Sequence, residues 1–328
     1  MPSLRALSVL LALALLAACS PAAAPTPTEP PSASAVPTVV SPPLPALESF
    51  DPASVAHISL ADYPVIPAIS ANARAIYQAG LARGNNPGVF SKLGDCMTEN
   101  PYFLVTFADG DYDLGQYGDL AGVLSHYSAA PARSANWELN SFATLGLAAA
   151  SGFNIAGPLD ATWADPAWCK GGESPAACEY RWAKPSAAII MFGTNDVAYT
   201  DAATYNYFLR TLVAETVAQG IVPLLNTFPT RPEDPDKSLL LNRIVVRVAQ
   251  DYDIPLVNLN RALEPLPHQG VNPNDTIHLS VPVDQQVDYF TEAHLQSGFT
   301  MRNLVTLQAL QALRVAVEGE TTASRDRR

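Results

Sequence analysis

Short apolar runs alternate with longer segments of helical periodicity along most of this chain. One run, 187–192, is continuously apolar, as expected of a strand buried on both faces of a sheet. A segment follows at 203–219 whose apolar residues recur at the three- and four-residue spacing of one helix face. This alternation predicts a parallel sheet with helices packed on both sides.

The same criteria predict the other main elements. The predicted strands are residues 89–93, 187–192, 221–228 and 254–259. The predicted helices are residues 71–83, 116–127, 203–219, 238–252 and 300–317. Such a β-α-β-α-β succession predicts an α/β fold, a three-layer α/β/α sandwich with a central parallel sheet. Ligands of such sheets bind beyond the carboxyl ends of the strands, so residues that follow each strand are candidates for function.

The amino-terminal residues read as a targeting signal rather than as part of the fold. Arg5 is followed by an apolar run at 6–18, which is too short to cross a membrane because a span takes roughly 20 residues. The run leads into a Leu-Ala-Ala-Cys motif that ends at Cys19 and matches the bacterial lipobox. We therefore expect a lipoprotein signal peptide over residues 1–19, lipidation of Cys19 and anchoring to the outer face of a bacterial membrane. The alternative is an ordinary secretory signal in which Cys19 is incidental.

The next residues have the composition of a linker. Residues 20–49 consist mainly of Pro, Ala, Thr and Ser, which cannot bury enough apolar surface to offset the entropy lost on ordering. We expect a disordered tether there, one folded domain over residues 50–320 and a solvated tail over residues 321–328.

Charge narrows the classes of partner. Asp and Glu number 31 against 19 Lys and Arg, which gives a net charge of −12. A phosphate-rich partner would be repelled, so the composition argues against nucleic acid as a ligand. We expect a monomer that contacts the membrane through its amino-terminal lipid only.

The four cysteines divide into different roles. Cys169 and Cys178 lie in one loop rich in Gly, Pro and Trp, and in an exported protein this pair predicts a local disulfide. A metal site is the alternative, but the loop has no nearby His and no second Cys pair. With Cys19 assigned to lipid, Cys96 is the remaining thiol, and it is either a buried inert side chain or a reactive one.

Three polar segments are placed to meet at one edge of the predicted sheet. Residues 94–98 and 193–196 each follow a predicted strand, and residues 275–279 lie in a later loop. His278 is a natural general base, and Asp275, three residues earlier, can orient its ring. An isolated Asp-x-x-His is more often structural, but the expected convergence of the three segments favours a site.

The segments Gly-Asp-Cys-Met-Thr (94–98), Gly-Thr-Asn-Asp (193–196) and Asp-Thr-Ile-His-Leu (275–279) resemble, in this order, the signature blocks of the SGNH (GDSL) hydrolases. The resemblance spans about residues 89–313 and implies a flavodoxin-like sandwich of SGNH hydrolase type with no metal or organic cofactor. In that family a serine stands at the position of Cys96.

The resemblance also implies a role for each matching residue. Cys96 would be the nucleophile, His278 its base and Asp275 the residue that orients the base. The backbone N–H of Cys96 and the side-chain amide of Asn195 would donate to the oxyanion. The family's remaining block supplies a glycine N–H, and here the match is poor; Gly146 is the candidate for that donor.

These expectations describe an exported, lipid-anchored hydrolase that cleaves ester or thioester acyl groups, with acylated glycans or lipid esters as substrates. The alternative is a degenerate relative that keeps the crevice and binds a ligand without cutting it, in which Cys96 is a small buried thiol. The acidic stretch 109–115 has the carboxylate spacing of a calcium loop. It has Leu114 and Leu120 where that loop needs Gly and Glu, so it predicts a turn and no metal site.

Overall fold

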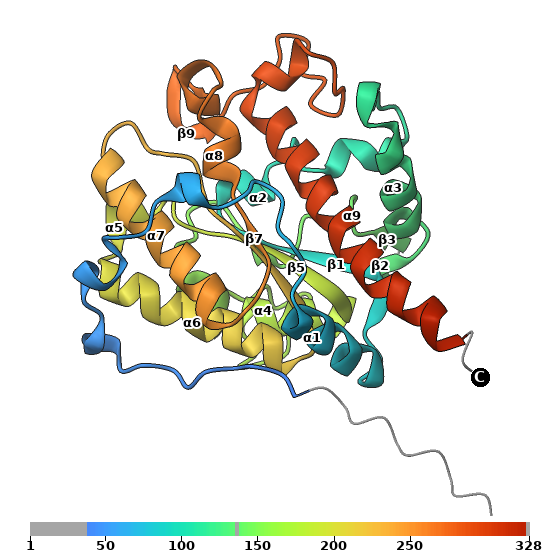
Figure 1. Cartoon of the computed structure of the whole chain (residues 1–328), viewed down its shortest axis with the longest axis horizontal. Coiled ribbons are helices and arrows are strands. Elements are labelled where there is room, and N and C mark those ends of the chain that lie inside the picture. Colours follow the sequence, from blue (N-terminus) through green and yellow to red (C-terminus); the bar gives the residue numbers. More distant parts are fainter. Residues whose placement is uncertain (1–37, 135–137, 326–328) are drawn as a thin grey trace, which may run out of the picture. The chain divides into compact units, whose positions relative to one another are not determined.

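The central sheet lies in the middle of the computed structural model, which describes residues 38–134 and 138–325 (Figure 1). Within these residues the sheet has five parallel strands in the order β4-β1-β5-β6-β7. The strands are β1 Asn86–Gly94, β4 Ala148–Ala149, β5 Pro185–Met191, β6 Val222–Asn226 and β7 Leu256–Val257. In chain order this is the 2-1-3-4-5 arrangement of a doubly wound fold, so the direction of winding changes at β1.

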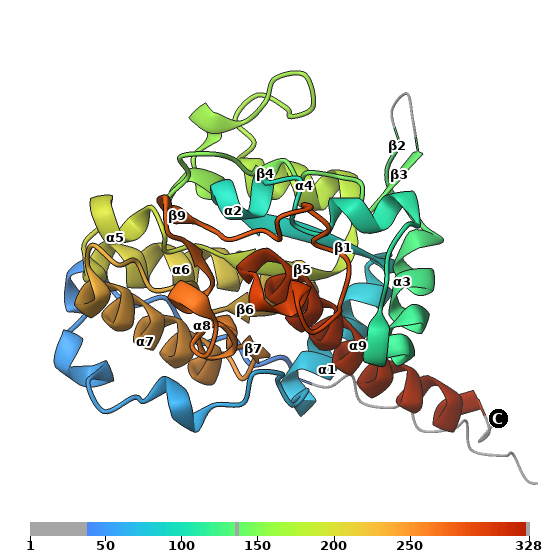
Figure 2. The same ribbon diagram turned by 90° about the horizontal axis from the view of Figure 1, so that it is seen from above.

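Helices cover both faces of the sheet, which confirms the predicted three-layer sandwich. Figure 2 shows α6 and α7 on one side of the sheet and α3 and α9 on the other. The helices are α1 Ala71–Ala82, α2 Cys96–Glu99, α3 Ala121–Ser128, α4 Pro175–Ala183, α5 Asp196–Tyr199, α6 Ala202–Ala218, α7 Pro235–Asp251, α8 Leu259–Leu263 and α9 Gly298–Arg325. Two antiparallel hairpins complete the described fold: β2 Pro131–Ser134 with β3 Glu138–Asn140, and β8 Val271–Asn272 with β9 Asp275–Leu279.

The sequence explains why the long elements form where they do. The side chains of Ser70, Asp201 and Asp234 each accept a hydrogen bond from a backbone N–H in the first turn of α1, α6 and α7, so these helices begin at capping residues. Every residue of β5 is buried, in keeping with a strand that is paired on both edges and covered on both faces.

Predicted and observed elements agree best where the pattern is long. The predicted helices 71–83 and 203–219 correspond to α1 and α6 within one residue at either end. The predicted helix 116–127 is divided into a 3₁₀ segment, Gly115–Leu120, and α3, and Tyr117 within the 3₁₀ segment leaves the helical conformation. Strand β4 is absent from the prediction, since two alanines carry no periodic signal.

The folded part begins earlier than the predicted boundary at residue 50. The backbone N–H of Val40 donates to Asn72 Oδ1 at 2.7 Å, and Asn72 Nδ2 donates to the carbonyl of Tyr252 at 2.7 Å. The described part of the predicted tether is therefore attached to α1 and to the loop that leads into β7. The predicted signal peptide and Cys19 lie outside the described residues. No helix of the described chain is long and apolar enough to cross a membrane.

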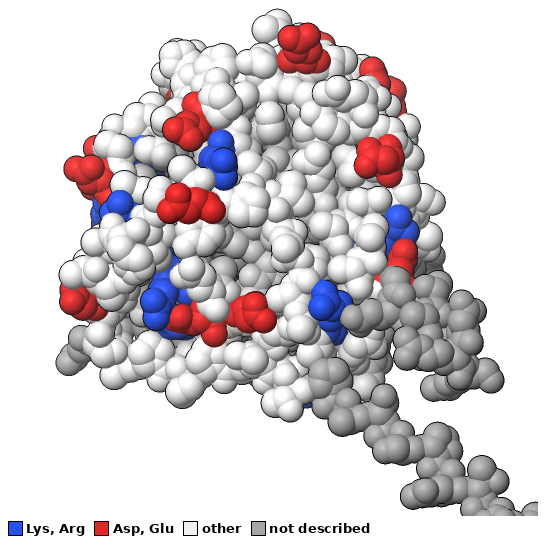
Figure 3. Space-filling view, in the orientation of Figure 1, with Lys and Arg blue, Asp and Glu red and all other residues white. Residues whose placement is uncertain are grey.

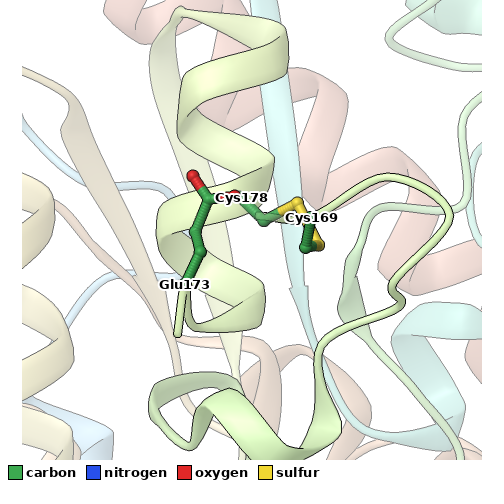
Figure 4. Close-up of side chains that lie close together, drawn as sticks. All are labelled: Cys169, Glu173 and Cys178. Carbon is green, nitrogen blue, oxygen red and sulfur yellow. A yellow bond between two sulfur atoms is a disulfide. The ribbon is translucent and has the colours of Figure 1, made fainter. Parts of the chain in front are cut away.

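The predicted disulfide between Cys169 and Cys178 is confirmed (Figure 4). Glu173 lies beside it, and these three side chains form the group in the described chain whose donor atoms are close enough together to hold a metal ion. The two sulfurs are bonded to each other, however, and Glu173 pairs with Arg181 at 2.7 Å. Arg181 also donates to the carbonyl of Trp168 at 3.0 Å. The disulfide and this ion pair therefore fasten the loop that precedes α4.

Charged side chains on the face seen in Figure 3 lie in small groups around a mostly uncharged centre. This face carries no large basic patch of the kind that binds nucleic acid, in line with the net charge of −12.

Candidate active site

The turn that carries Cys96 is fixed by the residue before it. Strand β1 ends at Gly94, and the fully buried Asp95 accepts a hydrogen bond from the Met97 N–H at 3.0 Å through Oδ1. This N-cap makes Cys96 the first residue of α2. The backbone N–H of Cys96 has no hydrogen-bond partner among the described residues. It is therefore free to bind an oxygen of a ligand.

The Cys96 thiol is half-buried, and its surroundings favour the neutral form. Burial is the main cause that raises the pKa of Cys96 to about 12, and the negative charge of Asp95 adds to it. The nearby backbone N–H groups of Met97 and Cys96 oppose this rise. At neutral pH the sulfur is therefore protonated unless a base removes its proton.

Asp275 and His278 form a hydrogen-bonded pair at the end of a hairpin. Side chains three apart point to opposite faces of a regular strand. Asp275 Oδ1, however, accepts the N–H of Ile277 at 3.1 Å, which turns the chain locally. Asp275 Oδ2 can then reach His278 Nδ1, at 2.6 Å. This bond lowers the pKa of Asp275 and leaves Nε2 as the ring nitrogen available to a nucleophile.

The fold brings this hairpin to the nucleophile turn. Helix α2 packs against β9, and the two lie close together in both Figure 1 and Figure 2. In the described chain no hydrogen bond joins the Cys96 sulfur to the His278 ring. The side chains of His278 and Asp275 are 33% and 42% exposed, so the base is open to solvent.

The turn after β5 presents Asn195. Gly193 has φ +140°, and a Cβ there would lie 2.2 Å from the ring of Phe228, so only glycine fits this position. Asn195 is 9% exposed, and its Nδ2 donates to the carbonyl of Phe153 at 2.8 Å. One hydrogen of the amide is engaged in this way, and the second is available to a ligand. The next residue, Asp196, is buried and accepts the Ile155 N–H at 3.1 Å.

Gly146 does not lie at the end of a strand. A Cβ on it would be 2.4 Å from the carbonyl oxygen of Lys92, two residues before β1 ends. The chain beside the end of β1 is instead the turn after β4, where the Ala150 N–H donates to the Gly94 carbonyl at 3.3 Å. Gly152 in this turn has φ +84°, and its N–H has no partner among the described residues. The position beside the end of β1 is thus occupied by the turn that carries Gly152, and not by Gly146.

Two further contacts tie the turn after β4 to the nucleophile turn. Both the N–H and the hydroxyl of Ser151 donate to Glu99 Oε2 at 2.6 Å. Since Glu99 is the last residue of α2, this pair of bonds closes the side of the site next to Cys96.

Sequence reasoning missed a bridge between the Asn195 turn and the His278 hairpin. Arg231 Nη1 donates to the Thr194 carbonyl at 3.2 Å, and its Nε lies 3.3 Å from Glu233. Glu233 in turn accepts a hydrogen bond from the hydroxyl of Thr276. Only their position in the sequence could have indicated a role for Arg231 and Glu233. Both follow β6, and they therefore lie at the same edge of the sheet as the predicted segments.

The buried carboxyl of Asp196 predicts a dependence of stability on pH. Burial raises its pKa to about 6 from an ordinary 3.8, so the folded state keeps the proton between about pH 4 and 6 while the unfolded state loses it. The stabilisation from this group is complete below about pH 4 and is lost as the pH rises through 6. Asp196→Asn should therefore gain stability relative to the wild type by about 1–3 kcal/mol between pH 4 and pH 7, since one pKa unit corresponds to about 1.4 kcal/mol. Thermal melts of both proteins across this range measure the difference, and a constant difference would contradict the prediction.

Comparison with known proteins identifies a family for this chain. Residues 93–282 match the model of the GDSL-like lipase/acylhydrolase family. Similar solved structures include a lipase/acylhydrolase from Enterococcus faecalis (16% identity over 68% of this chain and 94% of that one, TM-score 0.39) and an acetyl xylan esterase (16%, 66% and 96%, TM-score 0.38). A third is a GDSL-like lipase from Bacteroides thetaiotaomicron (15%, 74% and 98%, TM-score 0.33). No curated protein matches the chain. Since the family match spans more than half of the sequence and includes Cys96, Asn195 and His278, the chain belongs to the GDSL-like lipase/acylhydrolase family.

Proposed function

We propose that this protein is an exported, lipid-anchored esterase that transfers the acyl group of its substrate to Cys96 and then to water. The observation that carries the proposal is that hydrogen bonds and one ion pair connect four separate segments at one edge of the sheet. Hydrogen bonds join the turn after β4 to α2 and to Asn195, and the Arg231–Glu233 bridge joins the Asn195 turn to the His278 hairpin. A nucleophile, a base and oxyanion donors held in this way are what acyl transfer requires.

The protonated thiol determines how the reaction begins. Burial raises the pKa of Cys96 to about 12, which favours the neutral thiol in the resting enzyme. His278 therefore takes the proton as the sulfur attacks, as a base does for a hydroxyl nucleophile. The S–C bond forms, the C–O bond to the leaving group breaks, and the imidazolium returns its proton to the leaving alkoxide. His278 then activates a water molecule, which hydrolyses the thioester and releases Cys96 as a thiol.

Three donors would hold the oxyanion. The N–H groups of Cys96 and Gly152 and the free amide hydrogen of Asn195 belong to neighbouring turns, and none of the three is used by another described residue. In this proposal Gly152 takes the role that the sequence suggested for Gly146. Preorganised donors of this kind stabilise the charge that develops in the transition state.

Acylated glycans are the substrate class that the surroundings of the site favour, ahead of lipid esters. Trp163 is 64% exposed, and its ring packs edge-to-face against the ring of Phe153 at a centroid distance of 6.0 Å. The Phe153 carbonyl holds Asn195, so the exposed indole lies near the oxyanion turn. A flat aromatic face that is open to solvent suits stacking against a sugar ring.

One observation favours the second candidate function, a binding protein that keeps the cleft without the chemistry. The raised pKa of Cys96, together with the absence of a Cys96–His278 hydrogen bond in the described chain, is also what an inert thiol would show. The two functions differ in whether the protein turns over any ester.

Substitution of Cys96 separates these functions. A panel of short-chain acyl esters, including acetylated sugars, should be hydrolysed by the wild type, while Cys96→Ala should lower kcat by more than about a thousandfold, as loss of a nucleophile does. Cys96→Ser should remain active, because the resting site already stabilises a neutral nucleophile. Full activity of Cys96→Ala would place the chemistry elsewhere. A wild type that cleaves no ester but binds acylated sugars in calorimetry would establish the binding protein.

Asn195→Ala tests the oxyanion donors. Loss of one such donor should lower kcat about 100- to 1000-fold with little change in KM. Steady-state kinetics on the best ester of the panel measure both constants. Asn206→Ala serves as a control for the loss of a buried amide, since Asn206 is buried in α6 and its Oδ1 accepts a hydrogen bond from Arg210 of the same helix. A fall confined to KM would show that Asn195 binds substrate without stabilising the oxyanion.

Cys19→Ser tests the anchor. A lipobox cysteine that carries acyl chains holds a protein firmly to a membrane, so the wild type should sediment with membranes after expression in a bacterium. The variant should lose the lipid and lack stable anchoring. Metabolic labelling with a radioactive fatty acid gives an independent readout, and label retained by Cys19→Ser would contradict lipidation at this residue.

A further inference from the structure

A buried arginine lies directly behind the nucleophile turn. Arg302, on α9, is fully buried, and its Nη1 donates to the Met97 carbonyl at 2.6 Å. Its Nη2 donates to the hydroxyl of Thr98 at 2.9 Å. Both acceptors belong to α2, whose first residue is Cys96. The guanidinium therefore holds the helical turn that presents the sulfur.

The charge of this guanidinium has no carboxylate bound to it. No hydrogen-bonded ion pair joins Arg302 to an acidic side chain of the described chain, and its Nε has no hydrogen-bond partner there. The negative charge that acts on it most is that of the buried Asp95, which lies in the same turn as Cys96. The guanidinium carbon instead lies 3.6 Å from the centre of the Phe103 ring. Placing a cation in such a site carries a large desolvation cost, which a structural role could avoid with a neutral side chain. Two hydrogen bonds to α2 do not by themselves require a charge.

We propose that Arg302 is a positioning residue for Cys96, and that its positive charge, which no carboxylate binds directly, stabilises the negative charge that forms on the sulfur when the thiol proton leaves. The proposal rests on the proposed function only in that Cys96 is the nucleophile. Coulomb interactions are strong over short distances in a buried site, where water does not screen them.

The other charged groups around Cys96 do not supply the positive charge that a thiolate needs at neutral pH. Asp95 in the same turn and Asp275 on β9 both act against a thiolate, and His278 faces the cleft from β9. Lys92 on β1 is also buried, but burial lowers its pKa to about 7, so it is only partly charged at neutral pH. Burial lowers the pKa of Arg302 to about 9, which still leaves it charged at pH 7. Arg302 is therefore the cation beside Cys96 that stays charged at this pH.

The segment held by α9 offers a matched control. Asn303, the next residue on the helix, is also fully buried and also holds the chain after α2: its Oδ1 accepts the Leu104 N–H at 3.1 Å, and its Nδ2 donates to the Tyr102 carbonyl at 2.9 Å. Asn303→Ala therefore loosens the same region without removing a charge. A comparison of the two positions separates the electrostatic effect from the mechanical one.

The test is the rate at which iodoacetamide alkylates Cys96 in the full-length protein, measured between pH 7 and pH 10 by mass spectrometry of the peptide that contains Cys96. Arg302→Met and Arg302→Gln should both slow the reaction about tenfold at a given pH, which is the effect of raising the thiol pKa by one unit. Arg302→Lys should react nearly as the wild type does. Asp95→Asn, which removes a negative charge but keeps a capping side chain, should speed the reaction.

Loss of structure alone would raise the rate of alkylation of Cys96 instead of lowering it. A loosened turn exposes the thiol, so Asn303→Ala should react as fast as the wild type or faster. An unchanged or faster reaction in folded Arg302→Met or Arg302→Gln would overturn the proposal, and so would an equal slowing in Arg302→Lys. If Arg302→Met fails to fold, Arg302→Gln, which keeps a donor for the Met97 carbonyl, decides the matter. Alkylation of Cys96 does not require that the protein turns over an ester. A wild type without esterase activity would therefore contradict the proposed function, whereas the alkylation rates would still decide whether Arg302 stabilises the thiolate.

Discussion

Pairing of β1 on both of its edges is the constraint on which the site depends. Strand β4 pairs with one edge and β5 with the other, so that Gly94 stands opposite both Ala149 and Met191. This register places the three strand ends at one level, and the turns that follow them meet without any long loop. A one-residue slip of either neighbour would turn its side chains to the opposite face and separate the turns. The positions of the candidate site residues are thus set by backbone pairing before their side chains make a contact.

The sequence could predict the long helices, the central strands and the convergence of Cys96, Asn195 and His278, because all of these rest on periodicity and on strand order. It could not locate the turn after β4. A strand of two alanines has no periodic pattern. Gly146 was the candidate for the glycine donor only because of its distance in the sequence from the other segments. The Arg231–Glu233 bridge was equally invisible, since an Arg and a Glu in a loop are ordinary surface residues until their partners are known.

The charges that surround the Cys96 sulfur could also not be predicted from the sequence. Counting cysteines suggested that Cys96 is a reactive thiol. The structure shows it between a buried carboxylate on one side and a buried guanidinium that binds its helix on the other. A thiolate stabilised in advance, as in enzymes that pair cysteine with an imidazolium, does not fit these surroundings. A neutral thiol, from which a base takes the proton during the reaction, fits them better.

The attachment of Val40 to Asn72 fixes where the described chain begins relative to the candidate site. Asn72 is bonded to Tyr252, in the loop that enters β7, so the described chain joins the fold near the amino end of that strand. The turns of Cys96 and Asn195 follow the carboxyl ends of their strands, on the opposite edge of the sheet. The start of the described chain and the candidate site are therefore separated by the length of the strands, so a substitution at Asn72 would loosen the first without contact with the second.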